Sequence, residues 1–130
     1  MSHICLENYH DICTFGSILL HLRDPFLALQ RVTSHVKETA IVTDVFRGRI
    51  YLAELILGCR LIRFIPNAKS LSPVETWWKL TPKLVSEFLQ ILGFVHTKIS
   101  FHWQIAQDKK GRYKKILLFT VVGHRKKPVT

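Results

Sequence analysis

Hydrophobic residues recur along the chain in two kinds of pattern, one typical of helices and the other typical of strands. Residues 11–20 begin with the short apolar run of a buried strand, which ends at Gly16. Residues 24–36 open with Asp-Pro, a capping residue and a proline suited to the first helical turn, and continue with apolar residues at helical spacing. After a turn at 37–39, the β-branched run 40–46 is typical of a second strand. The pattern predicts a parallel strand–helix–strand unit with a right-handed crossover.

The second half of the chain repeats the helical signal once and then turns to strands. Thr81-Pro82 is another cap-plus-proline start, and an apolar helical stripe follows over 84–92, with Gly93 placed to end the helix. Residues 99–106 then alternate between apolar and polar side chains, which predicts an edge strand with one dry face.

A hairpin turn at 108–112 leads to the final run, 116–122, which is apolar on both faces. A strand that is apolar on both faces belongs inside a sheet. We therefore expect the last strand to insert between the alternating strand and the parallel pair.

The middle of the chain has a weaker signal. Residues 50–57 predict a short helix that ends near Gly58, and residues 66–73 are rich in loop formers. An irregular segment of this kind is either a substrate lid or a plain connector, and the sequence leaves both open.

Composition limits the class of protein. The chain has 130 residues, which suits one small domain, and 48% of them are hydrophobic, which favours a packed core. No apolar stretch is long enough to cross a bilayer, and the N-terminus has no signal-peptide pattern, so we expect a cytoplasmic protein without a membrane partner. The three cysteines have no metal-ligand or disulfide spacing, so no metal site is expected. The formal net charge of +10 favours a polyanion such as RNA, although ordinary solvated charges explain it equally well.

Two segments carry a resemblance to a known family. The stretch DICTFGSILLHLRDP at 11–25, with Ala-Leu at 28–29, resembles the fourth strand and following loop of class I S-adenosylmethionine-dependent methyltransferases. The stretch TWWKLTP at 76–82, followed by LQILGF at 89–94, resembles the substrate-side loop and last helix of the same enzymes. Both are most similar to the branch of the tRNA wobble-uridine carboxymethyltransferases. The resemblance implies an α/β fold, the C-terminal half of a Rossmann-like methyltransferase sheet, in which a terminal antiparallel hairpin follows the parallel unit.

That fold implies a partial methyltransferase domain over 1–130, with a core at about 8–124 and a basic tail at 125–130. The family binds S-adenosylmethionine with a glycine-rich loop after its first strand. The six glycines of this chain form no G-x-G motif, and only about ten residues precede the presumed fourth strand. The resemblance therefore implies that the first three strands are missing, that this chain alone does not bind the cofactor well, and that a companion chain supplies them. Self-association through the exposed strand edge is the alternative.

The resemblance also assigns roles to residues after the first strand. Phe15, Gly16, Ser17 and Leu20 would line the methionine end of the cofactor, with core packing an equal alternative for the two apolar side chains. His21 would act as a catalytic base or orient the substrate, or it would be a structural histidine.

The substrate side is assigned in the same way. Trp77 and Trp78 would stack on a base or an aromatic substrate, or close the mouth of the core. Arg60 and Arg63 are candidates for binding an anionic group of the substrate.

Three functions remain open at this point. The chain is part of an enzyme that methylates a tRNA or small-molecule acceptor, or it is a non-catalytic remnant that binds a partner through its strand edge, or it is a small basic RNA-binding module.

Overall fold

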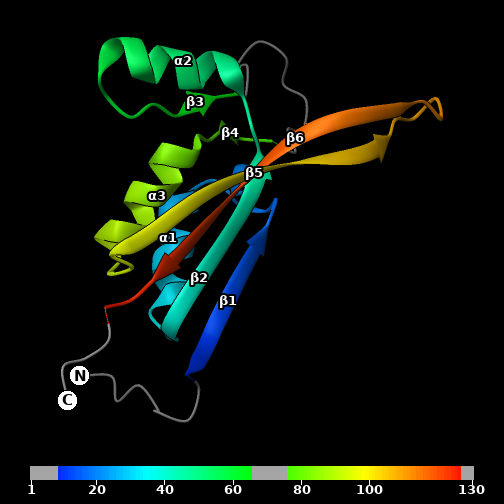
Figure 1. Cartoon of the computed structure of the whole chain (residues 1–130). Coiled ribbons are helices and arrows are strands. Elements are labelled where there is room, and N and C mark those ends of the chain that lie inside the picture. Colours follow the sequence, from blue (N-terminus) through cyan, green and yellow to red (C-terminus); the bar gives the residue numbers. More distant parts are fainter. Residues whose placement is uncertain (1–8, 66–75, 127–130) are drawn as a thin grey trace.

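The computed structural model describes residues 9–65 and 76–126, which form an α/β domain (Figure 1). A four-stranded sheet has the order β1-β2-β6-β5, and a second sheet of two short strands pairs β3 with β4. The elements are β1 (His10–Gly16), the short 3-10 helix η2 (Leu19–His21), α1 (Pro25–Thr33), β2 (Val36–Val45), α2 (Gly48–Leu57), β3 (Arg63–Phe64), β4 (Trp78–Lys79), α3 (Pro82–Ile91), β5 (His96–Gln107) and β6 (Tyr113–His124).

The predicted strand–helix–strand unit is confirmed. Strands β1 and β2 are parallel, with Phe15 opposite Val42. The side chain of Asp24 caps α1 by accepting a hydrogen bond from the backbone N–H of Leu27 at 2.9 Å. The expected end of this helix was wrong, because α1 stops at Thr33 and β2 already begins at Val36. Residues 37–39, expected to form a turn, lie within β2, where pairing with neighbouring strands outweighs local preference.

The predicted position of the last strand is also confirmed. β6 lies between β2 and β5 and is antiparallel to both, so β5 is the edge strand. Ahead of this hairpin, the side chain of Thr81 caps α3 by accepting from the backbone N–H of Leu84 at 3.1 Å. Gly93 follows α3 with a φ of 102°, a conformation that favours glycine.

Helices α1 and α3 pack on the same face of the large sheet (Figure 1). The core between them is dry: Leu29 of α1, Val85 and Leu89 of α3, and Val42 and Val121 of the sheet are all 0% exposed. This layer buries the apolar stripes that the sequence showed.

The opposite face of the sheet is not covered by α1 or α3. Ile12 of β1 points to this face and is 56% exposed, while Ile41 and Val122, paired across β2 and β6, are half-buried. β1 pairs only with β2 among the described strands, so its other edge has unpaired backbone groups. The described part of the domain thus has an open sheet face next to an open strand edge.

The β5–β6 hairpin extends beyond the sheet as an arm (Figure 1). β6 pairs with β5 over its whole length, but with β2 only from Leu118 to His124. The dry face expected for β5 is therefore wrong beyond Ile99: Phe101 is 50% exposed, and Trp103 and Ile105 are each 66% exposed. Phe101 still packs edge-to-face against the ring of Phe46, with ring centroids 5.2 Å apart.

Arg125, expected to begin a solvated basic tail, is a structural residue instead. Its guanidinium donates three hydrogen bonds to backbone carbonyl oxygens, of Val36 at 2.9 Å, Leu92 at 3.0 Å and Thr33 at 2.8 Å. It also lies 4.1 Å from the ring centroid of Phe94. Arg125 thereby joins the ends of α1 and α3 to the start of β2, which are far apart in sequence. Residues 127–130 of the expected tail lie outside the described part of the chain.

Helix α2 begins at Gly48, two residues before the expected start, and ends where Gly58 adopts a φ of 66°. The helix is anchored by Glu54, which is fully buried and accepts hydrogen bonds from the backbone N–H of Leu61 at 3.0 Å and the hydroxyl of Thr81 at 2.5 Å. None of the described helices is long and apolar enough to cross a membrane.

Candidate functional site

The carboxyl ends of β1 and β2 meet next to the small β3–β4 sheet, and ligands of open α/β sheets bind outside such ends. A small cavity of about 50 Å³ lies here, between the end of β2 and the strand β4. Its lining residues are Leu20, Asp44, Val45, Arg47, Thr76, Trp78, Lys79 and Leu80. The predicted loop 66–73, which lies between β3 and β4 in the sequence, is outside the described residues.

Asp44 is the most unusual group of the site. Its side chain is 3% exposed, and its Oδ1 accepts a hydrogen bond from the backbone N–H of Val45 at 2.7 Å, while its Oδ2 has no hydrogen-bond partner among the described residues. Burial raises the pKa of this carboxyl from 3.8 to about 6, against the lowering effects of the Val45 hydrogen bond and of the charges of His21 and Arg47. A buried acid that titrates near neutral pH is a candidate proton acceptor.

The end of β1 is shaped by a strained residue. Ser17 has a φ of 49°, in the left-handed region that non-glycine residues rarely occupy, and its N–H donates to the carbonyl of Thr43 at 2.8 Å. Gly16, beside it, has no atom of the described residues within 4 Å of the place where a Cβ would stand. Phe15 points the other way and is 8% exposed, within the core. The turn therefore leaves an open backbone surface at Gly16 and Ser17.

The loop after β1 is linked to the tryptophan segment. The carbonyl of Leu20 accepts a hydrogen bond from the N–H of Trp77 at 2.7 Å, and the indole Nε1 of Trp78 donates to the carbonyl of Arg23 at 3.0 Å. The guanidinium of Arg23 lies 5.3 Å from the ring centroid of Trp77. Both tryptophans thus have structural partners, and they bring β4 over the site. His21 belongs to the same loop, where its charge acts on Asp44.

The two predicted arginines are separated by the structure. Arg60 forms an ion pair with Glu87 of α3 at 2.9 Å, which gives it a partner away from the cavity. Arg63 lies on β3 opposite Lys79 of β4, and the pKa of Lys79 is lowered by desolvation and by the positive charges of Arg63, Arg47 and Arg49. Arg47 and Lys79 therefore line the cavity, and the charges of Arg63 and Arg49 reach Lys79, an arrangement that favours an anionic ligand.

Asp44, Arg47 and Lys79 were not among the predicted site residues. The sequence held one signal for Asp44, since it is a carboxylate inside a β-branched run, where an unpaired charge is costly. Nothing local indicated Arg47 or Lys79, because their proximity depends on the β3–β4 pairing.

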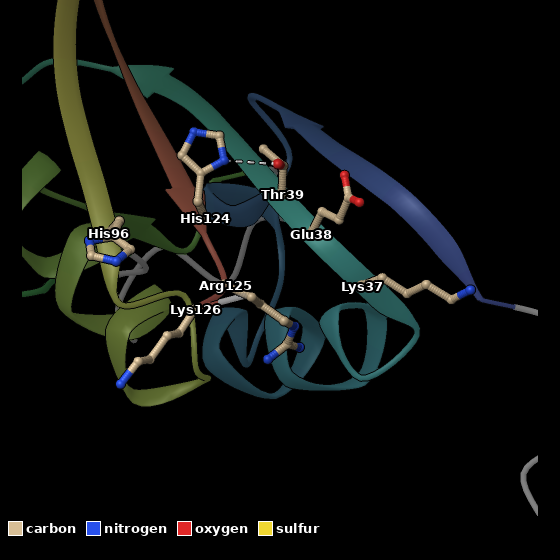
Figure 2. A pocket seen from close by; sticks show the side chains of 7 residues that line it. All are labelled: Lys37, Glu38, Thr39, His96, His124, Arg125 and Lys126. Carbon is tan, nitrogen blue, oxygen red and sulfur yellow. Dashed lines mark hydrogen bonds between the residues drawn. The ribbon is translucent and has the colours of Figure 1, made fainter. Parts of the chain in front are cut away.

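A second hollow, of about 850 Å³, lies at the opposite end of the sheet (Figure 2). It is lined by Lys37, Glu38, Thr39, His96, His124, Arg125 and Lys126. A hydrogen bond of 3.0 Å joins the Thr39 hydroxyl to Nδ1 of His124, as Figure 2 shows. The guanidinium of Arg125 already donates to three backbone carbonyl oxygens. Among the residues that the structure describes, no group of side chains has the arrangement of a metal site, here or elsewhere. Cys13 and Cys59 are free thiols.

Comparison with solved structures defines the fold. The N-terminal domain of EvdMO1 with S-adenosylhomocysteine bound matches 92% of this chain, with a TM-score of 0.55 and 15% identity. The chain has a class I methyltransferase fold. The same EvdMO1 domain crystallised with S-adenosylhomocysteine and D-fucose matches 95% of the chain, with a TM-score of 0.55 and 14% identity. An S-adenosylmethionine-dependent methyltransferase from Methanosarcina mazei matches 91%, with a TM-score of 0.54 and 14% identity.

The methyltransferase fold is present only in part. The chain spans 48%, 52% and 60% of the lengths of these three proteins. No family model and no curated protein sequence matches the chain. At these identities the comparisons establish the fold class predicted from the sequence, whereas the tRNA-modifying branch stays a prediction.

Proposed function

We propose that the chain forms the acceptor side of an S-adenosylmethionine-dependent methyltransferase site, at the carboxyl ends of β1 and β2. The observation that carries the proposal is the combination of a methyltransferase fold with a strained turn and a buried, half-unpartnered Asp44 at the edge where α/β enzymes bind ligands. The acceptor would be a tRNA or a small molecule, and the cations at the cavity favour one with an anionic group.

The residues present fit one wall of a cofactor site. The open backbone surface at Gly16 and Ser17 leaves room for the methionine end of the cofactor, which supplies the methyl group when bound. No glycine-rich loop is among the 130 residues. We therefore propose that further strands, from a companion chain or another segment, pair with the open edge of β1 and complete the site. Asp44, or His21 next to it, would accept the proton that the acceptor releases.

The first test is a titration of the ¹⁵N-labelled chain with S-adenosylhomocysteine, followed by NMR chemical shifts. We expect binding in the millimolar range, with shifts concentrated at the amides of Gly16, Ser17 and Leu20. Gly16→Val should weaken this binding, because the added side chain fills the space beside the turn. Ser34→Val, at the C-cap of α1 and away from the carboxyl ends of β1 and β2, is the control and should leave it unchanged.

The outcomes separate the parts of the proposal. Shifts centred on the other end of the sheet, or insensitivity to Gly16→Val, would refute the cofactor wall. Micromolar binding by the chain alone would refute the need for further strands.

A non-catalytic partner-binding role is the second candidate, and the same open edge of β1 favours it. It predicts no specific shifts with S-adenosylhomocysteine at any concentration.

A further inference from the structure

We propose that the β5–β6 arm is a binding platform for single-stranded RNA. The proposal goes beyond methyl transfer, because the arm lies outside the site at the ends of β1 and β2, and its test requires no cofactor. Three features of the arm carry it: exposed aromatic rings on one face, a dense cluster of cations at the tip, and projection away from the packed layers (Figure 1).

One face of the arm has a row of large side chains that are not covered. Trp103 is 66% exposed, Ile105 is 66% exposed and Tyr113 is 77% exposed. Tyr113 lies opposite Gln107, so it is on the same face as Trp103 and four residues further along, which is roughly 13 Å at the rise of a strand. Two aromatic rings at this separation are available for stacking by successive bases of an extended strand, and stacking accepts any base.

Cations are placed among these rings and beyond them. Lys115 lies opposite Ile105, on the aromatic face and between the two rings. The tip adds Lys109, Lys110, Arg112 and Lys114, so the segment 107–115 has five cations against one carboxylate. All of these cationic residues are exposed. A groove of cations that follows a row of aromatic rings is the usual platform for a single-stranded nucleic acid.

The one carboxylate of the tip does not neutralise these charges through ion pairs. Oδ1 of Asp108 accepts hydrogen bonds from the backbone N–H groups of Lys110 at 2.9 Å and Arg112 at 2.8 Å, which fixes the turn. The tip residues line a shallow hollow of about 390 Å³. The turn thus keeps the cationic residues of the tip close to one another, and none of them forms an ion pair with a described residue.

Charge also decides between RNA and a second copy of the chain. An apolar row by itself would suit self-association, but each copy would bring a five-cation tip, next to this row, to the interface. The formal net charge of +10 adds to this repulsion. The phosphates of a single-stranded RNA neutralise these charges, and its bases cover the apolar row.

The test is fluorescence anisotropy with a labelled oligouridine of about 12 nucleotides, titrated at several salt concentrations, with a duplex of equal length for comparison. Trp103→Ala should weaken binding of the single strand about tenfold and leave the salt dependence unchanged, because it removes stacking alone. The triple substitution Lys109→Gln, Lys110→Gln, Arg112→Gln should reduce the slope of log affinity against log salt by about 2.

Two matched controls distinguish the arm from the basic surface as a whole. The triple substitution Arg31→Gln, Lys98→Gln, Lys126→Gln removes the same charge from exposed positions elsewhere and should change the slope less than the arm substitutions. Leu57→Ala removes an apolar side chain of α2 that is 65% exposed and should leave binding unchanged. Circular dichroism establishes that each variant is folded.

Several results would overturn the proposal. Equal losses in the arm and control triple variants would assign binding to net charge alone, and equal affinity for single strand and duplex would exclude base stacking. If Trp103→Ala left RNA affinity unchanged and converted a dimer to a monomer in light scattering, the aromatic row would belong to a second copy. None of these results bears on the cofactor wall, which the titration with S-adenosylhomocysteine tests separately.

Discussion

Ionisation of Asp44 should make the folded chain less stable as the pH rises from about 4 to about 7. Burial raises the pKa of this carboxyl from 3.8 to about 6 in the folded protein. Between these two values the unfolded chain has lost its proton and the folded chain has kept it, so the free energy of unfolding falls with pH. Above the folded pKa the loss is complete, and it amounts to about 3 kcal/mol.

The perturbation that isolates this effect is Asp44→Asn. Asparagine has the shape of aspartate and keeps an oxygen that accepts from the backbone N–H of Val45, but it does not ionise. Its amide would meet the same unpartnered surroundings as Oδ2 at every pH, so that cost is a constant offset. The stability of the variant relative to the native chain should therefore increase by about 2–3 kcal/mol between pH 4 and pH 8.

The assay is urea denaturation followed by tryptophan fluorescence at several pH values, with linear extrapolation to water. Asp11→Asn, at an exposed position of β1, controls for the change in net charge. His21 and Arg47 act on the same carboxyl and remain present in both proteins, so the difference between the two curves reports Asp44. Parallel pH curves for the native chain and Asp44→Asn would show that the carboxyl is solvated, and the candidate site would lose its main acid.

Three further substitutions test contacts within the domain, each by urea denaturation. Arg125→Ala removes the donor to three carbonyl oxygens and should lower the free energy of unfolding by about 2–4 kcal/mol, whereas Lys126→Ala should change it little. Equal effects of the two substitutions would show that the three hydrogen bonds of Arg125 do not stabilise the domain. Glu54→Ala leaves two donors without their acceptor and should cost about 2–3 kcal/mol, of which Glu54→Gln should recover a part. Gly123→Ala would place a methyl 2.9 Å from Cβ of Phe94 and should cost about 1–3 kcal/mol, and an alanine variant of native stability would show that β6 and α3 pack less tightly.

Local signals in the sequence were sufficient for most of the fold. Asp24 and Thr81 begin their helices as their side chains predict, because a cap needs only a backbone N–H three residues away. The apolar run of the last strand predicted its place inside the sheet, because a strand with two apolar faces is stable only between layers and neighbours.

Local signals failed where a neighbouring element decides the outcome. The start of β2 at Val36 depends on its pairing with β1, and β6 joins from Thr39 on, so the strand extends into residues that prefer a turn. Apolar and polar residues alternate in the same way along all of β5, both where helices cover the strand and where they do not. Only the length of the pairing between β6 and β2 shows that Trp103 and Ile105 project beyond the four-stranded sheet.

The sequence by itself determined the strand–helix–strand unit and the internal last strand, since each depends on periodicity, capping or residue type within a short stretch. The tertiary structure decided the site and the arm. Asp44 acquires a raised pKa only when β2 is buried beside the loop after β1, and Arg125 finds its carbonyl partners only when helices from both halves of the chain meet. Such properties arise from burial and from contacts between residues distant in sequence, which no local pattern records.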